Sequence, residues 1–235
     1  MPEKRDVSYG HDCMTEKETD KYQAPQAFHE HTEEYDSWFE DSLVYEIEVT
    51  ALRSLHVEMD DPKVEIGVGP GRFAKTLGGS FGLDPAWAPL TLASKRGIMC
   101  CQAFGEQLPV KDRIIGTIYI LFTLCFAADP QKILRESSRS LKDGGHLIIG
   151  MIPSESAWGR ILTAKKKADH PLYKYARFYT IETLRKWLAD ANMSIVEYRS
   201  TLYQAPGCVE QNEPPKDILD EHAGFAVIVV RKNQA

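Results

Sequence analysis

The chain has 235 residues, enough for one α/β domain that buries most of the surface its unfolded form exposes. A net charge of −6 disfavours DNA or RNA as the main partner, because phosphate binding requires a basic face. Residues 1–24 lack the apolar segment of a secretory signal, and no apolar run reaches the roughly 18–20 residues that span a bilayer, so no membrane association is expected.

The cysteines are odd in number and show no Cys-x-x-Cys spacing, which favours reduced thiols and a cytoplasmic location. They are Cys13, Cys100, Cys101, Cys125 and Cys208. The adjacent pair in the third predicted strand is expected to be buried as small hydrophobes.

The N-terminal part of the chain contains two different segments. Residues 1–24 show no hydrophobic periodicity and are expected to be a mobile tail that precedes a domain over 25–235. From 25 to 55, apolar residues recur at helical spacing and predict two helices, which form a cover over about 25–56.

Strands and helices then alternate, which predicts parallel strand pairing with helices on both faces. The expected strands are 64–67, 81–84, 98–103, 114–121, 146–151, 194–200 and 224–231, with helices over 72–77, 85–95, 130–141 and 180–192. Residues 152–178 interrupt this alternation and are mixed, aromatic and basic. The order predicts an α/β fold: a doubly wound, Rossmann-like, seven-stranded sheet with a small helical lid at 152–178.

The glycine-rich segment Glu65-Ile66-Gly67-Val68-Gly69-Pro70-Gly71 indicates a nucleoside site. Glycines at alternate positions let backbone N–H groups face a ligand without Cβ obstruction. A dinucleotide fingerprint would place its third glycine where this chain has Arg72, so the loop suits a ligand without a pyrophosphate and disfavours a nicotinamide oxidoreductase.

The chain resembles the class I S-adenosylmethionine-dependent methyltransferases of the small-molecule, methyltransferase-11-like group. The segment 65–71 matches the first motif of that family and Gly82-Leu83-Asp84-Pro85 the second. Gly105-Glu106-Gln107-Leu108-Pro109 matches the segment after strand three, and Gly144-Gly145-His146-Leu147 matches the entry to strand five. More narrowly, Tyr35–Phe39, Thr123–Pro130 and Ala176–Thr180 resemble segments of uncharacterised archaeal and bacterial members.

The resemblance implies S-adenosylmethionine as cofactor and S-adenosylhomocysteine as product. Asp84 is expected to accept both ribose hydroxyls, because charge-assisted hydrogen bonds are the strong ones. Glu65 is expected to order the loop and to help place the ammonium group. The cofactor residues implied are Glu65, Gly67, Gly69, Gly71, Asp84, Pro85, Phe104, Gly105 and Glu106. Many relatives carry an aspartate where this chain has Phe104, which leaves open how adenine is held.

The reaction expected is in-line transfer of a methyl group (EC 2.1.1.-) to an O, N or S atom of an unidentified small molecule. Orientation supplies much of such catalysis, and a base is needed only for an acceptor that keeps its proton. The catalytic candidates are Tyr35, His170 and Arg177, with Arg177 also the candidate for an anionic substrate group. The substrate candidates are Trp38, Thr123, Trp158, Arg177 and Tyr179.

Two alternatives and one further question stay open at this point. The cysteines prompt a thiol or arsenite methyltransferase, and the divergent Phe104 allows a non-catalytic cofactor-binding protein of the same fold. The sequence predicts no metal site, and it does not distinguish a monomer from a homodimer.

Overall fold

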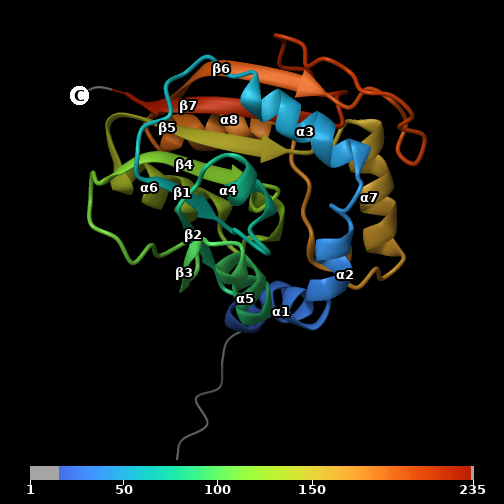
Figure 1. Ribbon diagram of the computed structural model, residues 1–235, viewed down its shortest axis with the longest axis horizontal. Coiled ribbons are helices and arrows are strands. Elements are labelled where there is room, and N and C mark those ends of the chain that lie inside the picture. Colours follow the sequence, from blue (N-terminus) through green and yellow to red (C-terminus); the bar gives the residue numbers. More distant parts are fainter. Residues whose placement is uncertain (1–15, 234–235) are drawn as a thin grey trace, which may run out of the picture.

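A single seven-stranded sheet organises the molecule, which a computed structural model describes over residues 16–233 (Figure 1). The strand order is β3-β2-β1-β4-β5-β7-β6. The strands are β1 (Lys63–Ile66), β2 (Phe81–Asp84), β3 (Met99–Gln102), β4 (Ile115–Leu121), β5 (Leu141–Met151), β6 (Met193–Thr201) and β7 (Phe225–Lys232). Strands β1 to β5 pair in parallel, whereas β7 runs antiparallel to β5 and β6. The predicted doubly wound, seven-stranded fold is confirmed.

Apolar side chains on both faces of the central strands explain why helices cover both sides. In β4, Ile118 and Ile120 belong to one core and Tyr119 and Leu121 to the other, as the two-residue period of a strand requires. The first face carries α6 (Pro130–Ser140) and α8 (Ile181–Asp190); the second carries α3 (Leu43–Arg53), α4 (Arg72–Thr76) and α5 (Trp87–Lys95) (Figure 1).

Helix N-termini follow the capping chemistry of the sequence. The side chain of Thr180 accepts a hydrogen bond from the Thr183 N–H and so begins α8, as predicted. Ser156 caps α7 (Ala157–Lys167) in the same way. With the 3₁₀ turn η2 (Tyr173–Tyr175), α7 occupies the 152–178 segment beside the carboxyl ends of the strands (Figure 1).

The N-terminal region differs from expectation in two respects. Helix α1 (Glu16–Glu30) begins inside the segment predicted to be a tail, and α2 (Thr32–Ser37) separates it from α3, so three helices stand where two were expected. The difference arose because α1 lacks helical hydrophobic periodicity and carries Pro25 within it. Residues 1–15 of the predicted tail, including Cys13, lie outside the described residues.

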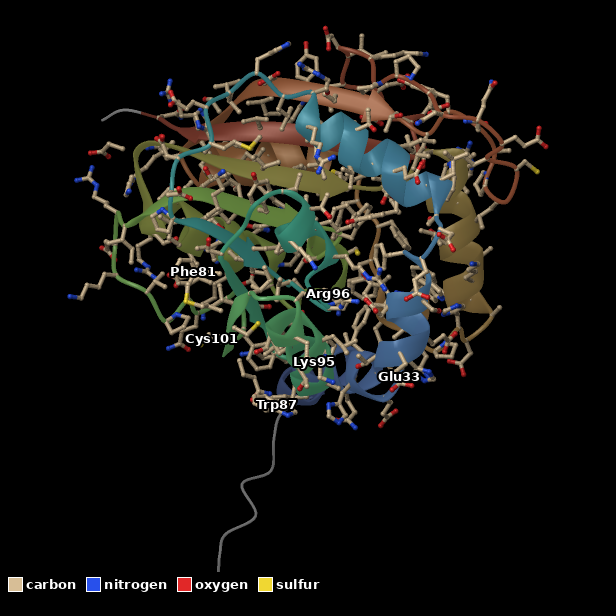
Figure 2. The ribbon with its side chains drawn as sticks, in the orientation of Figure 1. Glu33, Phe81, Trp87, Lys95, Arg96 and Cys101 are labelled. Carbon is tan, nitrogen blue, oxygen red and sulfur yellow. The ribbon has the colours of Figure 1, made fainter. Side chains whose placement is uncertain are left out.

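The cysteine prediction for strand three was wrong. Cys101 is exposed and Cys100 is only half-buried, because β3 is the edge strand of the sheet. Figure 2 labels Cys101 and two further exposed side chains, Phe81 and Trp87. Burial required a strand covered on both faces, which the position of β3 does not provide.

Within residues 16–233 no helix is both long and apolar enough to span a membrane. The same residues hold no cluster of three or more His, Cys, Asp or Glu side chains suited to a metal ion.

Candidate active site

The carboxyl ends of β1, β2 and β4 meet where the strand order reverses, between β1 and β4. Open α/β sheets bind ligands at such a switch point. A groove lies there, and it brings together most of the predicted cofactor residues. These are Gly67, Gly69, Asp84, Pro85, Phe104, Gly105 and Glu106, joined by Thr123.

The glycine loop has a backbone that other residues would not adopt without strain. Gly67 and Gly69 have φ angles of 73° and 51°, in the left-handed region. A Cβ at Gly67 would also overlap the Thr123 side chain, whose Oγ1 lies 3.2 Å from the Ile66 carbonyl oxygen. The loop therefore has two separate reasons for glycine at position 67, one conformational and one steric.

These two reasons can be separated by mutation. Gly78 has a φ of 72°, but no neighbouring atom lies within 4 Å of the position that a Cβ would take, so Gly78→Ala incurs the conformational cost alone. That cost is about 1–2 kcal/mol of unfolding free energy. We expect Gly67→Ala to destabilise further and to weaken S-adenosylhomocysteine binding at least tenfold, measured by chemical denaturation and calorimetry. Equal effects of the two substitutions would contradict the steric role of Thr123.

Asp84 is held by two backbone hydrogen bonds. Its Oδ2 accepts from the Gly69 N–H at 2.9 Å and its Oδ1 from the Ala86 N–H at 2.8 Å. Burial raises the pKa of Asp84 to about 6 against the opposing effect of those bonds. Each carboxylate oxygen keeps a further lone pair. The side chain thus links the glycine loop to the start of α5 and still presents acceptors to the groove.

Glu65 and Gly71 lie outside the lining of the groove. Glu65 is 3% exposed and accepts a hydrogen bond from the Ala74 backbone, while its Oε2 has no partner in the described part of the chain. Burial raises the pKa of Glu65 well above its usual range. A Cβ at Gly71 would lie 2.9 Å from the Ala93 Cβ. Glu65 thus contacts α4 and Gly71 packs against α5, so neither faces the groove, and the ordering role of Glu65 stays a prediction.

Phe104, which borders the groove, is covered by the part of α1 that was predicted to be a tail. The Nζ of Lys21 lies 3.9 Å from the centre of the Phe104 ring, and Tyr22 contacts the ring edge-on at 5.3 Å. Lys21 and Ala24 border the groove as well. Helix α1 therefore covers the position where relatives carry an aspartate.

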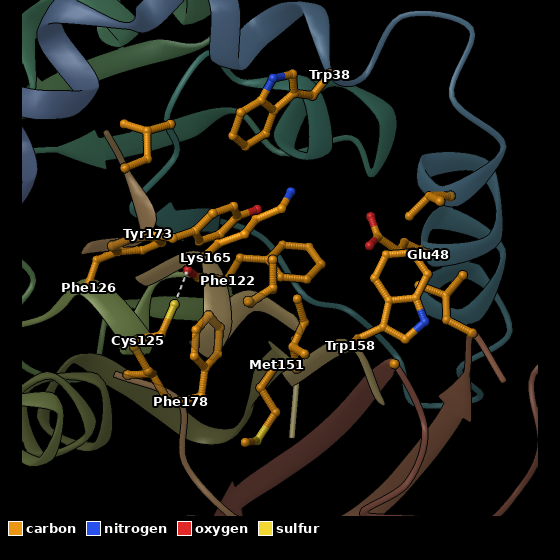
Figure 3. Close-up of a pocket in the computed structure, with 18 of the residues that line it drawn as sticks. Trp38, Glu48, Phe122, Cys125, Phe126, Met151, Trp158, Lys165, Tyr173 and Phe178 are labelled. Carbon is orange, nitrogen blue, oxygen red and sulfur yellow. Dashed lines mark hydrogen bonds between the residues drawn. The ribbon is translucent and has the colours of Figure 1, made fainter. Parts of the chain in front are cut away.

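A second cavity, of about 230 Å³, lies beside the groove under the N-terminal helices and α7 (Figure 3). Four aromatic residues border both spaces: Phe28, Tyr35, Phe122 and Phe126. The remaining lining is largely aromatic and aliphatic, and includes the predicted substrate residues Trp38, Trp158 and Tyr179. The two spaces share a wall, so ligands in them would approach each other there.

The predicted catalytic candidates have different positions. Tyr35 lies in the shared wall, and burial raises the pKa of its hydroxyl well above the usual range. The His170 ring contacts Trp38 and Tyr173, and its Nδ1 accepts from the Leu172 N–H at 3.2 Å. Arg177 is exposed. Neither His170 nor Arg177 borders the cavity, so the structure supports neither as a catalytic or anion-binding residue.

Thr123 borders the groove and does not border the cavity, so its position suits the cofactor better than the substrate.

An ion-pair network holds α2 against the glycine loop. Arg72 and Arg96 each donate to the Asp36 Oδ2 at 2.7 Å, and Arg96 also donates to the Pro70 carbonyl at 2.6 Å. Burial alone would raise the pKa of Asp36, but the hydrogen bonds from both guanidinium groups outweigh it and lower the pKa. No local pattern predicts this role of Arg72, because its partner Asp36 lies 36 residues away in the chain.

Replacing Asp36 by asparagine tests this network. We expect a loss of about 2–3 kcal/mol of unfolding free energy, measured by chemical denaturation, since two half-buried guanidinium groups lose their counter-ion. S-adenosylhomocysteine affinity should fall too, because α2 carries Tyr35. Glu40, an exposed carboxylate 3.0 Å from Arg72, is the control, and Glu40→Gln should cost less than about 1 kcal/mol. Equal losses of unfolding free energy in Asp36→Asn and Glu40→Gln would show that the burial of Asp36 with its arginine partners is unimportant.

The glycine loop lies at the switch point and is linked to an acid at the end of β2, and Arg72 stands where a pyrophosphate-binding loop would have a glycine. These features define a nucleoside-binding α/β protein of the methyltransferase class. Residues 64–149 match a family model described as a methyltransferase domain. The structure is similar to that of an S-adenosylmethionine-dependent methyltransferase of Thermotoga maritima, described as a possible histamine N-methyltransferase. The two are 34% identical with a TM-score of 0.83, over 89% of this chain and 100% of the other. The chain belongs to the family of S-adenosylmethionine-dependent methyltransferases.

Two further relatives extend the similarity over most of the chain. An uncharacterised protein of Mycobacterium tuberculosis is 40% identical over 83% of this chain and 70% of its own length. An uncharacterised protein of Methanocaldococcus jannaschii is 35% identical over 87% of this chain and 98% of its own length. The predicted resemblance to uncharacterised archaeal and bacterial proteins is thereby confirmed.

Proposed function

We propose that this methyltransferase transfers a methyl group from S-adenosylmethionine in the groove to a small, mostly apolar molecule in the adjoining cavity. The observation that carries the proposal is the wall shared by the two spaces, formed by Phe28, Tyr35, Phe122 and Phe126. The related Thermotoga maritima protein, described as a possible histamine N-methyltransferase, would likewise act on a small molecule.

The residues present fit the proposed cofactor. Asp84 offers free carboxylate lone pairs to a ribose diol, and the strained loop at Gly67 and Gly69 leaves room for a close approach of the backbone. Lys21 and Phe104 would enclose the adenine end. When bound, S-adenosylmethionine supplies a methyl group attached to a positively charged sulfur. The electron pair of that bond passes to sulfur when the methyl group is transferred.

The chain then has three tasks in the proposed reaction: to orient the acceptor, to exclude water and to stabilise positive charge. The aromatic lining excludes water, and the Tyr35 ring would face the sulfonium, which an aromatic face stabilises. Because its hydroxyl keeps its proton at neutral pH, we assign Tyr35 to positioning and not to proton removal. The segment with α7 and η2 would serve as a lid over the acceptor, since Trp158 and Tyr173 border the cavity.

The thiol or arsenite alternative finds little support in the cavity. Of the four cysteines that the structure describes, Cys125 alone borders it, and burial raises the pKa of this thiol to about 12. Such a thiol stays protonated at neutral pH and is a poor ligand for a soft ion.

Incubation of the protein with methyl-labelled S-adenosylmethionine and a fractionated cell extract tests the proposal. We expect label in low-molecular-weight products and its loss with the Asp84→Ala variant. Label found solely on protein or nucleic acid would overturn the proposed acceptor class, and no transfer with intact cofactor binding would favour the non-catalytic alternative.

A further inference from the structure

Glu48 is a buried acid in an otherwise largely apolar cavity. It lies on α3, is 7% exposed and borders the cavity (Figure 3). Its carboxylate has no hydrogen bond and no ion pair within the part of the chain whose side chains are described. Burying a carboxyl group without a hydrogen-bond partner destabilises the folded state, so the fold gains nothing by keeping it.

The surroundings of Glu48 suit a cation. The aromatic side chains of Trp38, Tyr45 and Trp158 border the same cavity, and aromatic faces attract positive charge. In Figure 3 the Glu48 carboxylate extends inward beside Trp158, on the side of the view opposite Phe126. Burial raises the pKa of Glu48 to about 8, and no neighbouring base opposes this effect. A carboxyl group in this state ionises when a cation arrives beside it.

We propose that Glu48 binds a protonated amine of the acceptor molecule, a role that rests on the function proposed above. The acceptor is then an apolar or aromatic compound with an ammonium group at one end. An ammonium group has no lone pair, and Glu48 borders the cavity but not the groove. The atom that receives the methyl group is therefore a second nucleophile of the same molecule, held at the wall shared with the groove.

The other ionisable groups of the cavity do not compete for this role. Burial raises the pKa of the Tyr35, Tyr45, Tyr173 and Tyr179 hydroxyls and of the Cys125 thiol, so all stay neutral near pH 7. Lys165 is exposed on α7, with its Nζ 5.6 Å from the centre of the Tyr173 ring. Amine binding near pH 7 should therefore release close to one proton, from the Glu48 carboxyl group.

The test is calorimetry on the S-adenosylhomocysteine-saturated protein, with 2-phenylethylamine as probe. The neutral and anionic controls of similar size are 2-phenylethanol and 3-phenylpropionate. We expect the amine to bind at least tenfold more tightly than either control, with proton release visible as a dependence of the heat on buffer. Glu48→Gln should abolish the preference, whereas Glu46→Gln, an exposed glutamate on the same helix, should keep it.

No amine preference in the wild-type protein, including no binding of any probe, would overturn the proposal even if the Glu48 variant failed to fold. A preference kept by a folded Glu48→Gln variant would overturn it as well. The preceding S-adenosylhomocysteine titration separates the two hypotheses: cofactor binding without amine preference contradicts the role of Glu48 alone, and absence of cofactor binding contradicts the proposed function.

Discussion

Asp84→Ala is expected to weaken S-adenosylhomocysteine binding by tenfold to a hundredfold. The substitution removes the carboxylate proposed to accept the ribose hydroxyls, and one decade of affinity corresponds to about 1.4 kcal/mol. It also removes the acceptor for the Gly69 N–H, so the loop that lines the groove loses a hydrogen bond of 2.9 Å. The first loss acts on the bound state alone and the second also on the free protein, and together they make this effect one of the two largest that we expect.

Calorimetry with S-adenosylhomocysteine measures the affinity, and thermal unfolding without ligand measures the separate effect on the fold. Asp143→Ala is the matched control, because Asp143 is an exposed aspartate paired with Arg113, outside the lining of the groove. Asp84→Asn keeps the size of the side chain but not its charge. Its affinity for S-adenosylhomocysteine should lie between those of Asp84→Ala and Asp143→Ala. Unchanged affinity in the alanine variant would contradict the proposed ribose contact.

Glu48→Gln is expected to make the protein more stable than wild type, by an amount that grows with pH. The Glu48 carboxyl group ionises near its ordinary pKa in the unfolded chain but only near pH 8 in the folded one. Between these values the folded state holds one more proton, so the wild-type free energy of unfolding falls as pH rises. Glutamine does not titrate and so lacks this fall.

The size of the effect follows from the pKa difference at 1.36 kcal/mol per pH unit, and amounts to about 4 kcal/mol at pH 8. For a chain of this length, that corresponds to roughly 8–16 °C in the unfolding midpoint. Thermal unfolding of both proteins at pH 5, 6, 7 and 8 measures it, with Glu46→Gln as control. A midpoint difference that stays constant over this range would mean that Glu48 is solvated or paired in the folded state.

The unfolding measurements on Glu48→Gln test the burial of Glu48 separately from its proposed ligand. A rising difference for Glu48→Gln shows that the cavity holds an unpaired acid at a cost to the fold, whatever the ligand is. Proteins retain such costs mainly where function requires them. The result would therefore add support to the proposed amine site without depending on the choice of probe.

The motifs predicted much of the cofactor groove, because each depends on short-range geometry. A turn with φ angles near +50° to +80° selects glycine at 67 and 69. An acid at the end of β2 reaches the loop that follows β1, because adjacent parallel strands end at the same edge of the sheet. The apolar composition of β4 likewise predicted a central strand, buried along its whole length.

Other features of the site depend on residues distant in the chain and could not be read from local patterns. Arg177 and His170 lie in the predicted lid but do not border the cavity, which no local pattern distinguishes. Helix α1 has no apolar periodicity, yet Lys21 and Ala24 cover the groove. The mixed pattern of α3 does not indicate that Glu48 is buried, since burial of one helix face depends on what packs against it.

The sequence by itself determined the doubly wound sheet and the glycine loop, because strand alternation and turn conformation depend on residues close together in the chain. Its resemblance to a known family indicated the cofactor. The tertiary structure alone decided which side chains border the proposed acceptor cavity, how Asp36 joins α2 to the loop, and that Glu48 lies inside without a partner among the described residues. Those features depend on contacts between segments tens of residues apart, and on the exclusion of water that such contacts produce.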